Sequence, residues 1–252
     1  MCGRYAASGS PEDLIVEYDA VDGTGGAVLP PDYNIAPTDP VLAVRTRASD
    51  GGRELSLARW GLVPSWAPDR RVGARYINAR AETVQQLPAF RSAFTRHRCL
   101  IPADGWYEWV ASARSGRLRR GTYVGADPPG RQAYYVTPYD GSGIAFAGLW
   151  EVWGERRLLT VTILTSAAVG PLAEVHSRMP LVLPPQRFAA WLDPSHQDPR
   201  ALLEPTPDDL VARLEIRPVG PRVGNVANDG PELTRRVEPS LPADRPGAQL
   251  LF

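Results

Sequence analysis

Lysine is absent from this sequence, and cysteine and histidine are scarce. All 28 basic residues are therefore arginines, whose planar guanidinium group makes forked contacts with phosphate. They balance 28 acidic residues, so any surface for nucleic acid must be a local patch. Two cysteines in 252 residues exclude a disulfide framework and a Cys-x-x-Cys metal motif. The three histidines, at positions 97, 176 and 196, have no ligand spacing, and we expect no metal ion and no cofactor.

Long apolar runs are also missing. No stretch approaches the roughly 20 apolar residues that span a membrane. Residues 1–5 lead into no apolar run, so we expect no signal peptide. We therefore expect a soluble, cytoplasmic protein with reduced thiols and no membrane contact. Nothing in the sequence calls for more than a monomer.

The 23 glycines and 26 prolines are scattered without a period, which indicates many turns between short strands. Hydrophobic patterns and turn residues predict strands at 41–45, 54–63, 99–110, 134–137, 144–153 and 158–164, the third interrupted at Asp104-Gly105. Short helices are predicted to begin after Ser10 and to cover 90–97, 167–175, 186–192 and 208–214, the last capped by Thr206. This mixture predicts an α+β fold with curled or barrel-like antiparallel sheets and several short flanking helices.

The chain is expected to form one domain over residues 2–237. Residues 238–252 are rich in proline and predict a flexible tail. Residues 114–129 are polar, basic and rich in glycine and proline, which predicts a long surface loop between two strands.

Cys2 is the first candidate for chemistry. A small residue after Met1 permits removal of the initiator, which leaves Cys2 with a free α-amine beside its thiol. The amine can form an imine with an aldehyde, and the thiol can then close a five-membered thiazolidine on the same carbon. Both groups titrate near neutrality, at about 8 for the amine and about 8.5 for the thiol, so modest tuning makes each nucleophilic. Taken alone, a Met-Cys start is more often an incidental cysteine at a frayed terminus.

Glu108 is the second candidate, because it lies among aromatic residues in a Gly-Trp-Tyr-Glu-Trp segment that begins at Gly105. Indole rings remove water from a neighbouring carboxyl group, which raises its pKa and suits it to general acid catalysis. The alternative is a solvent-facing glutamate on a strand whose Trp106 and Trp109 belong to the core.

Three further residues stand out, each with a structural alternative. Asn78 lies in a polar segment, 75–82, and either acts at a site or satisfies a buried turn. His176 lies between a predicted helix and a strand, where it is a candidate for catalysis or a solvated or capping residue. Trp66 follows a strand-like segment in a loop, and it either stacks on a base or packs against the fold.

Six short motifs occur in order along the chain. They are Met-Cys-Gly-Arg-Tyr at 1–5, Tyr-Asn-Ile-Ala-Pro at 33–37, Trp-Gly-Leu-Val-Pro-Ser-Trp at 60–66, Asn-Ala-Arg-Ala-Glu at 78–82, Gly-Trp-Tyr-Glu-Trp at 105–109 and His-x-Arg-Met-Pro at 176–180. This series resembles the SOS-response-associated peptidase family, also called abasic-site processing proteins. The resemblance runs from residue 1 to about residue 237, and residues 221–226 also fit it.

The resemblance implies that the protein senses abasic sites in single-stranded DNA and forms a covalent DNA-protein cross-link. It assigns the nucleophile to Cys2, the orienting amide to Asn78, and acid-base roles to Glu108 and His176. An abasic deoxyribose is mainly a closed hemiacetal, so protonated Glu108 or His176 would assist ring opening before the Cys2 amine attacks the C1′ aldehyde. Thiol closure then gives a thiazolidine that shields the site during the DNA damage response. His176 would also assist reversal of the link.

The resemblance also implies the DNA contacts and, when DNA is bound, association with the nucleoid. Arg4, Arg80 and Arg178 would contact phosphates. Trp66 and Trp109 would stack on bases or wedge the strand.

Two features bear on this implied DNA surface, and a third bears on a possible partner, the replication sliding clamp. Ala67 stands where many family members carry a second aromatic residue, which weakens the stacking role expected of its neighbour Trp66. The arginine-rich loop at 114–120 is either an extension of the DNA surface or a solvated insertion. The tail at 247–252, Gly-Ala-Gln-Leu-Leu-Phe, is loosely similar to bacterial sliding-clamp-binding peptides, although its glutamine lies one residue too close to the end.

Two other functions stay open. Cys2, His176 and Glu108 could form a thiol peptidase, and removal of Met1 could then be autoproteolytic. Since only Met1 precedes Cys2, an ordinary aminopeptidase would suffice for that removal. A non-catalytic single-stranded DNA-binding module is the other alternative, and it would leave the aminothiol of Cys2 without a purpose.

Overall fold

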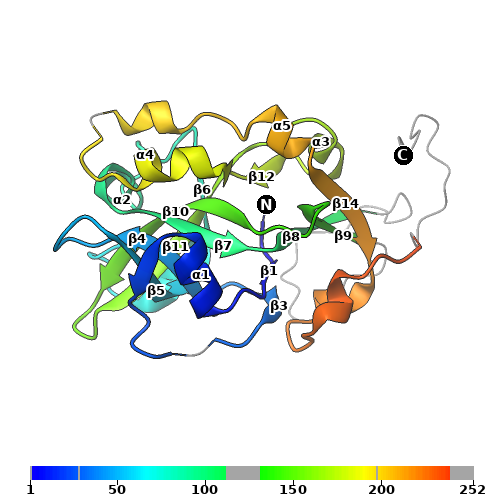
Figure 1. Ribbon diagram of the computed structural model, residues 1–252, viewed down its shortest axis with the longest axis horizontal. Helices are drawn as coiled ribbons and strands as arrows, with labels where there is room; N and C mark the ends of the chain where they lie inside the picture. The colour runs from blue at the N-terminus through cyan, green and yellow to red at the C-terminus, as the bar shows by residue number, and fades with distance from the viewer. Residues whose placement is uncertain (1, 28, 112–130, 197, 239–252) are drawn as a thin grey trace.

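Two β-sheets form the framework of the protein, and short helices lie around them (Figure 1). The computed structural model describes residues 2–27, 29–111, 131–196 and 198–238. In these ranges the larger sheet has the strand order β12 (Arg178–Pro180), β11 (Leu158–Ala167), β10 (Ile144–Trp153), β7 (Arg98–Ala103), β4 (Pro40–Thr46), β5 (Arg53–Trp60) and β2 (Ala20–Asp22). Beside it, β13 (Val182–Leu183) pairs with β10, and β6 (Asn78–Arg80) pairs with β11. The smaller sheet has the order β14 (Leu214–Val219), β9 (Arg131–Pro138), β8 (Gly105–Ala111), β1 (Tyr5–Ala7) and β3 (Asp32–Ile35).

Five strands of the larger sheet close into a barrel. The order β5, β4, β7, β10 and β11 is antiparallel at each step, and β11 then pairs in parallel with β5 through Val161 and Trp60. The predicted barrel-like α+β fold is confirmed. The structure adds parallel pairings of β11 with β5 and β6, and of β2 with β5, to the antiparallel ones. The two pairings with β11 arise because residues 61–77 carry the chain back to the same edge of β11, so β6 runs in the direction of β5.

The central barrel strands are buried on both faces. In β7, Cys99 and Ile101 belong to one apolar cluster while Leu100 belongs to another, and Phe146 and Ala147 of β10 divide in the same way. The sequences of such strands are continuous apolar runs, which is why these strands could be predicted from the sequence. One cluster packs under helices, and the other joins the barrel to β1 and the smaller sheet and contains Cys2.

The helices are short. They are α1 (Pro11–Glu17), α2 (Arg91–Arg96), α3 (Leu172–Val175), α4 (Phe188–Leu192) and α5 (Asp208–Val211), with 3₁₀ turns η1 (Arg70–Arg75), η2 (Pro185–Arg187), η3 (Pro199–Leu202), η4 (Pro221–Gly224) and η5 (Pro231–Thr234). Ser10 caps α1 as predicted, because its side chain accepts a hydrogen bond from the Asp13 amide. The predicted helix at 167–175 is shorter, because β11 runs to Ala167 and Gly170, with φ of +54°, separates that strand from α3.

The prediction that Thr206 caps the helix at 208–214 was wrong. Its hydroxyl lies in hydrogen-bonding distance of the Val182 amide, 3.0 Å away, and accepts that bond. The N-cap of α5 is Pro207, with no side-chain cap bond. Thr206 is therefore buried against β13 and joins two segments of the chain instead of beginning a helix.

Asp104 and Gly105 mark the passage of the chain from one sheet to the other. The predicted interruption of the strand at 99–110 is confirmed, since β7 belongs to the barrel and β8 to the smaller sheet. A Cβ atom at Gly105 would lie 2.3 Å from the Val136 carbonyl oxygen, so the crossing requires glycine. The same crossing carries Glu108 out of the barrel and alongside β1.

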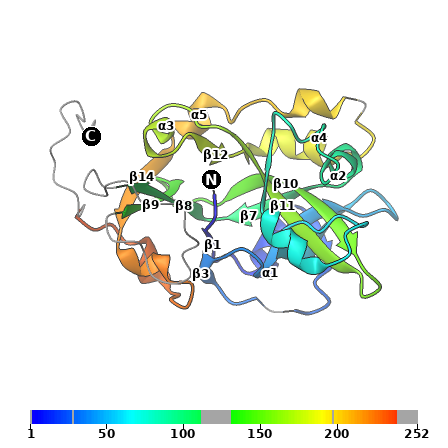
Figure 2. The ribbon, with the colours of Figure 1, turned by 180° about the vertical axis from the view of Figure 1, so that it is seen from behind.

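β1 belongs to the smaller sheet and also contacts the barrel strand β7, which lies close to it in both views (Figure 1, Figure 2). β1 was not predicted from the sequence, and neither was β14, because each is interrupted by small, polar or proline residues. The predicted loop at 114–129 and the tail beyond Glu238 lie outside the described residues. No helix among the described residues is long and apolar enough to cross a membrane.

Candidate active site

Cys2 lies directly before β1 and is fully buried. Because β1 pairs antiparallel with β8 through Tyr5 and Trp106, the residues before Tyr5 lie alongside Glu108. The Cys2 thiol donates a long hydrogen bond, 3.9 Å, to the Arg4 carbonyl oxygen. Burial raises the pKa of this thiol far above its usual range, and the neighbouring Glu108 carboxylate raises it further. Cys2 is therefore a fixed core residue and not a cysteine at a frayed end.

Asn78 holds the backbone of Cys2 in place. It is the first residue of β6, which pairs in parallel with β11, so the barrel fixes its position. Its amide Nδ2 donates a hydrogen bond of 2.6 Å to the Cys2 carbonyl oxygen. Its Oδ1 is buried and has no hydrogen-bond partner among the described residues. An acceptor left in this position is suited to a donor that arrives with the substrate or is formed during the reaction.

Glu108 is buried on β8, with 5% of its surface exposed. The alternative of a solvent-facing glutamate is therefore excluded. Desolvation raises the pKa of its carboxyl group, and the positively charged N-terminus of the chain and then His176 partly oppose this shift. The group therefore keeps its proton to higher pH than an exposed glutamate, which is the property that a general acid needs.

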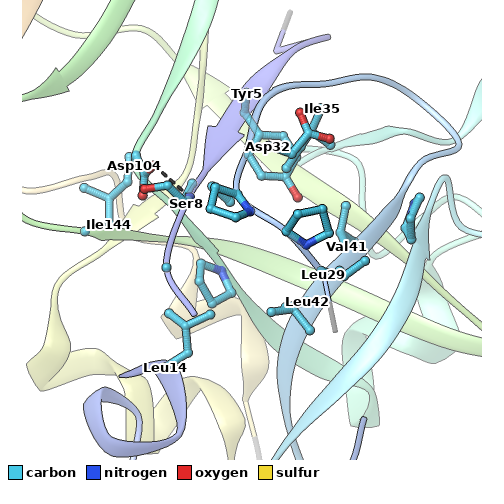
Figure 3. Close-up of a pocket in the computed structure, with 18 of the residues that line it drawn as sticks. Tyr5, Ser8, Leu14, Leu29, Asp32, Ile35, Val41, Leu42, Asp104 and Ile144 are labelled. Atoms are coloured by element: carbon cyan, nitrogen blue, oxygen red, sulfur yellow. Dashed lines mark hydrogen bonds between the residues drawn. The ribbon is translucent and has the colours of Figure 1, made fainter. Parts of the chain in front are cut away.

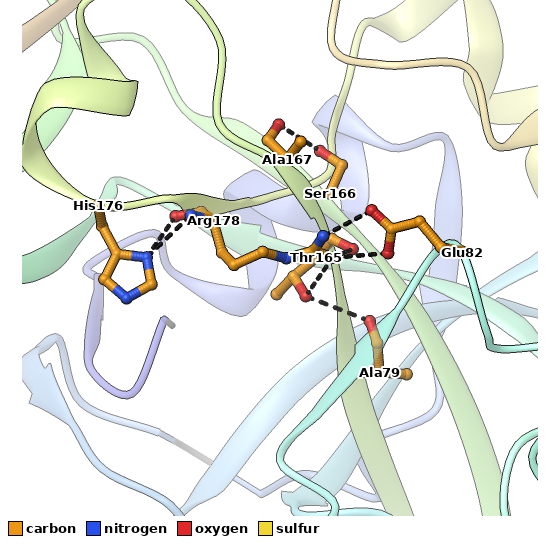
Figure 4. A network of polar contacts seen from close by, with 7 residues as sticks. All are labelled: Ala79, Glu82, Thr165, Ser166, Ala167, His176 and Arg178. Atoms are coloured by element: carbon orange, nitrogen blue, oxygen red, sulfur yellow. Dashed lines mark hydrogen bonds and ion pairs between the residues drawn. The ribbon is translucent and has the colours of Figure 1, made fainter.

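His176 follows the last residue of α3, and the backbone of Arg178 positions its ring (Figure 4). Its Nδ1 lies 2.9 Å from the Arg178 amide nitrogen, and 3.1 Å from the Arg178 carbonyl oxygen. The amide always donates, so in the neutral imidazole Nδ1 accepts and the proton is on Nε2. This hydrogen bond fixes the orientation of the neutral ring and leaves the Nε2 proton for other contacts.

Arg178 makes a forked ion pair with Glu82, at 2.5 and 3.0 Å, and also donates to the Thr165 carbonyl and hydroxyl oxygens (Figure 4). The hydrogen bonds from Arg178 lower the pKa of Glu82. No role was predicted for Glu82 from the sequence, where its position at the end of the motif at 78–82 is the only signal.

Arg4 ties β1 to distant segments of the chain. One nitrogen, Nη1, donates to Asn34 Oδ1 at 2.7 Å and to the Val223 carbonyl oxygen at 2.9 Å. Its guanidinium group also lies 6.0 Å from the ring centroid of Trp109. Asn34 in turn donates to the Asn225 and Asn228 carbonyl oxygens. The motif at 33–37 therefore ties β1 to distant segments, a role that was not predicted from the sequence.

The structure brings together the four candidate catalytic residues and separates the five candidate DNA contacts into two groups. Arg80 and Trp66 are exposed, Trp66 at 62%. The backbone next to Trp66 is fixed by a 2.7 Å hydrogen bond from the Trp153 indole to the Ala67 carbonyl oxygen. Arg4, Trp109 and Arg178 are half-buried and engage other residues of the chain.

Known proteins are similar to this chain in sequence and in fold. Residues 1–226 match the family model described as SOS response associated peptidase (SRAP). The chain is 33% identical to the abasic site processing protein YoqW of Bacillus subtilis over 92% of this chain and 98% of that protein. It is 29% identical to the abasic site processing protein YedK of Escherichia coli, over 94% and 100% of the two chains. A crystal structure from Bacteroides thetaiotaomicron, 20% identical, matches the fold with a TM-score of 0.76 over 94% of this chain and 100% of the other. This chain therefore belongs to the SOS response associated peptidase family.

Proposed function

We propose that this protein senses abasic sites in single-stranded DNA and links to them covalently through Cys2. The observation that carries the proposal is the position of Cys2, whose carbonyl group is held by Asn78 and whose thiol lies beside Glu108. Relatives similar along nearly their whole length are named abasic site processing proteins. Association with the nucleoid follows from such an activity.

The absence of lysine sharpens the choice of nucleophile. Once Met1 is removed, the α-amine of Cys2 is the only primary amine in the 251 residues left of these 252. An imine between the protein and an aldehyde can therefore form only there. Asn78 Oδ1, buried and with no partner among the described residues, is placed to accept a hydrogen bond from that amine.

The reaction begins with opening of the sugar. The hemiacetal hydroxyl group loses a proton, the ring oxygen gains one, and the C1′ aldehyde is exposed. Glu108 supplies the second proton, because burial keeps it protonated to higher pH. His176, with a proton on Nε2, is the second acid-base group.

Attack and ring closure follow at the same carbon. The Cys2 amine adds to the aldehyde carbon, and loss of one water gives the imine. The thiol then adds to the imine carbon, its proton passing to the imine nitrogen, and the thiazolidine forms. A raised thiol pKa favours this order, because the buried thiol stays protonated while the amine reacts.

The same thiol pKa argues against a thiol peptidase. Such an enzyme needs a cysteine whose pKa is lowered by an adjacent imidazolium, so that a thiolate is present at neutral pH. Here burial and Glu108 raise the pKa of Cys2. Nδ1 of His176 is also occupied by the backbone of Arg178.

For DNA, we propose that Arg80 and Trp66 make the first contacts, because they are exposed. Arg178 can reach a phosphate only by sharing or giving up its ion pair with Glu82. Arg4 and Trp109 would act mainly by positioning β1 and β8.

The decisive experiment uses a single-stranded oligonucleotide with one abasic site and a denaturing gel. The mature protein should give a stable shifted band, and Cys2→Ala should give none. Cys2→Ser keeps the amine but lacks the thiol, so it should give a band only after borohydride reduction of the imine. A protein that retains Met1, and an oligonucleotide with a tetrahydrofuran analogue that has no aldehyde, serve as controls.

Three results would contradict the proposal. A stable band with Cys2→Ala would show that another residue reacts. A complex that dissociates at high salt and leaves no band on the denaturing gel would indicate a simple binding module. Cleavage of peptides without DNA, lost in Cys2→Ala, would indicate a peptidase.

A further inference from the structure

A pocket of about 330 Å³ lies away from the residues of the proposed reaction. Its walls come from the start of the chain, α1, the segment before and within β3, the start of β4, and the end of β7 with the start of β10 (Figure 3). Cys2, Asn78, Glu108 and His176 do not line it. Its volume is in the range of pockets that hold small molecules.

The charge of the pocket is one-sided. Four acidic residues line it, Glu17, Asp32, Asp104 and Asp229, and no arginine or histidine is among the described residues of its wall. Much of the remaining wall is apolar and includes Leu14, Leu29, Ile35, Val41, Leu42 and Ile144. Aliphatic walls with a few polar groups suit a ligand with a charged head and an apolar stem.

Tyr5 provides an independent observation. It is 1% exposed, it lines the pocket, and its hydroxyl group forms no hydrogen bond with any described residue. Edge contacts with Trp60 and Phe146, at 5.2 and 5.7 Å between ring centroids, fix the ring. A hydroxyl group that has no described partner and sits on a fixed ring of the pocket wall can hydrogen-bond to a ligand in the pocket.

Two of the acidic groups are held in place by hydrogen bonds. The Asp104 carboxyl group accepts from Ser8, whose amide donates to Oδ2 and whose side chain also lowers the pKa of this group, and Asp32 Oδ1 accepts from the Asn34 amide. Both carboxyl groups line the pocket and face a ligand there. The four acids do not converge on one point, since no group of three or more His, Cys, Asp or Glu in the described chain is placed to hold a metal ion. The arrangement suits a larger cation that is contacted from several sides.

We propose that this pocket binds a small organic cation, an ammonium group on an apolar stem. The carboxylates of Asp32 and Asp104 receive the charge, the Tyr5 hydroxyl accepts a further hydrogen bond, and the aliphatic wall covers the stem. The site is separate from the cross-linking chemistry and would be present in the full-length chain whether or not that chemistry occurs.

The pKa values of the acidic residues in the pocket support the same ligand. Burial raises the pKa values of Glu17, Asp32 and Asp104, and repulsion adds to this, from Asp104 on Glu17 and from Asp229 and Asp39 on Asp32. Arg4 and hydrogen bonds from Ser8 and Asn34 oppose the shifts. A bound cation favours the ionised carboxylates, so binding should release protons and become tighter as pH rises.

The test measures binding of pentylamine, with 1-pentanol as a neutral match of nearly the same shape. Titrations followed by amide chemical shifts should show saturable binding of the amine, at least tenfold tighter than that of the alcohol, with the largest shifts at Tyr5, Ser8 and Ile144. The amine keeps its charge up to a pKa near that of lysine, about 10.4, so its affinity should rise between pH 5.5 and pH 8.

Variants separate charge from shape. Asp104→Asn keeps the acceptor for the Ser8 amide, and Tyr5→Phe keeps the ring, so both should stay folded while each weakens binding several-fold. Glu155→Gln, an exposed acid on a distant turn, should have no effect. Equal binding of amine and alcohol, shifts spread away from the pocket, or full affinity in both Asp104→Asn and Tyr5→Phe would overturn the proposal.

Discussion

Glu108 shows how a single residue acquires its chemistry from its surroundings. Burial on β8 raises the pKa of its carboxyl group, so the acid form persists above the usual range. If this acid opens the sugar ring, the rate of cross-linking should fall as pH rises through the raised pKa. In Glu108→Gln the rate should be about 10²- to 10⁴-fold lower and should lack this fall, because no proton is available at any pH.

The measurement is the rate of cross-link formation across pH, with affinity for undamaged DNA as the control. Glu151→Gln changes another buried glutamate and should leave the pH profile unchanged. If Glu108→Gln lost binding and rate in equal measure, the residue would have only a structural role.

The sequence could predict residues whose chemistry is local. Trp neighbours indicated a desolvated Glu108 as one of two alternatives, and the six motifs taken together made Cys2 the preferred nucleophile. It could not predict the contacts of Arg4 within the chain, because its partners Asn34 and Val223 are 30 and 219 positions away along the chain. A forked guanidinium looks the same in a sequence whether it binds phosphate or its own backbone.

At the scale of elements, Glu82 and Arg178 join the end of β6 to the edge of β11 and β12. The proposal that DNA competes with this ion pair has a direct consequence. In Glu82→Gln, Arg178 keeps its bonds to Thr165 but loses a neutralising carboxylate. Affinity for undamaged single-stranded DNA should rise several-fold at low salt, and its salt dependence should become steeper.

Fluorescence anisotropy at several salt concentrations measures this effect, and Glu155→Gln corrects for the change in net charge alone. An unchanged affinity in Glu82→Gln would show that Arg178 positions the chain near His176 and does not meet phosphate.

Asn34 is the element-scale contact with the largest expected effect on stability. Its side chain links β3 to Arg4 and to the turns after η4 through three hydrogen bonds. Asn34→Ala should lower the free energy of unfolding by about 3 kcal/mol, because one of these bonds involves a charged group and all are shielded from water. Urea denaturation measures the change.

Asn225→Ala is the matched control. The oxygen that Asn225 offers to Asn34 belongs to its backbone and survives the substitution, so the loss should be below about 1 kcal/mol. Equal losses in the two variants would show that the motif at 33–37 does not depend on the Asn34 side chain.

Strand positions could be predicted from the sequence, but several pairings could not. The apolar composition of buried segments such as 144–153 is enough to predict a strand. The parallel contact of β5 with β11 joins Trp60 to Val161, and no local pattern records it. The prediction for Thr206 was wrong for a similar reason, because its hydroxyl group accepts a hydrogen bond from the Val182 amide and does not cap the helix that follows it in the chain.

For the whole molecule, closure of the barrel buries polar groups where the chain crosses between the sheets at Asp104. Burial raises the pKa of the Asp104 carboxyl group, and hydrogen bonds from Ser8 oppose this shift. In the window between the unfolded and folded pKa values, the native state binds more protons than the unfolded state. Stability therefore falls as pH rises through this window, and above it the ionised carboxylate is a net cost to the fold.

Asp104→Asn should remove that cost while keeping the acceptor for Ser8. The urea midpoint should rise relative to the wild type at pH 7, and the difference should shrink as pH falls through the raised pKa of Asp104 and the wild-type carboxyl group takes up its proton in the native state. Carboxylates with lowered pKa, such as Glu215 beside Arg217, change in the opposite sense and lose stability as pH falls, equally in both proteins. The difference between the two pH curves therefore isolates Asp104. A constant difference at all pH values would mean that the substitution acts through packing and not through charge.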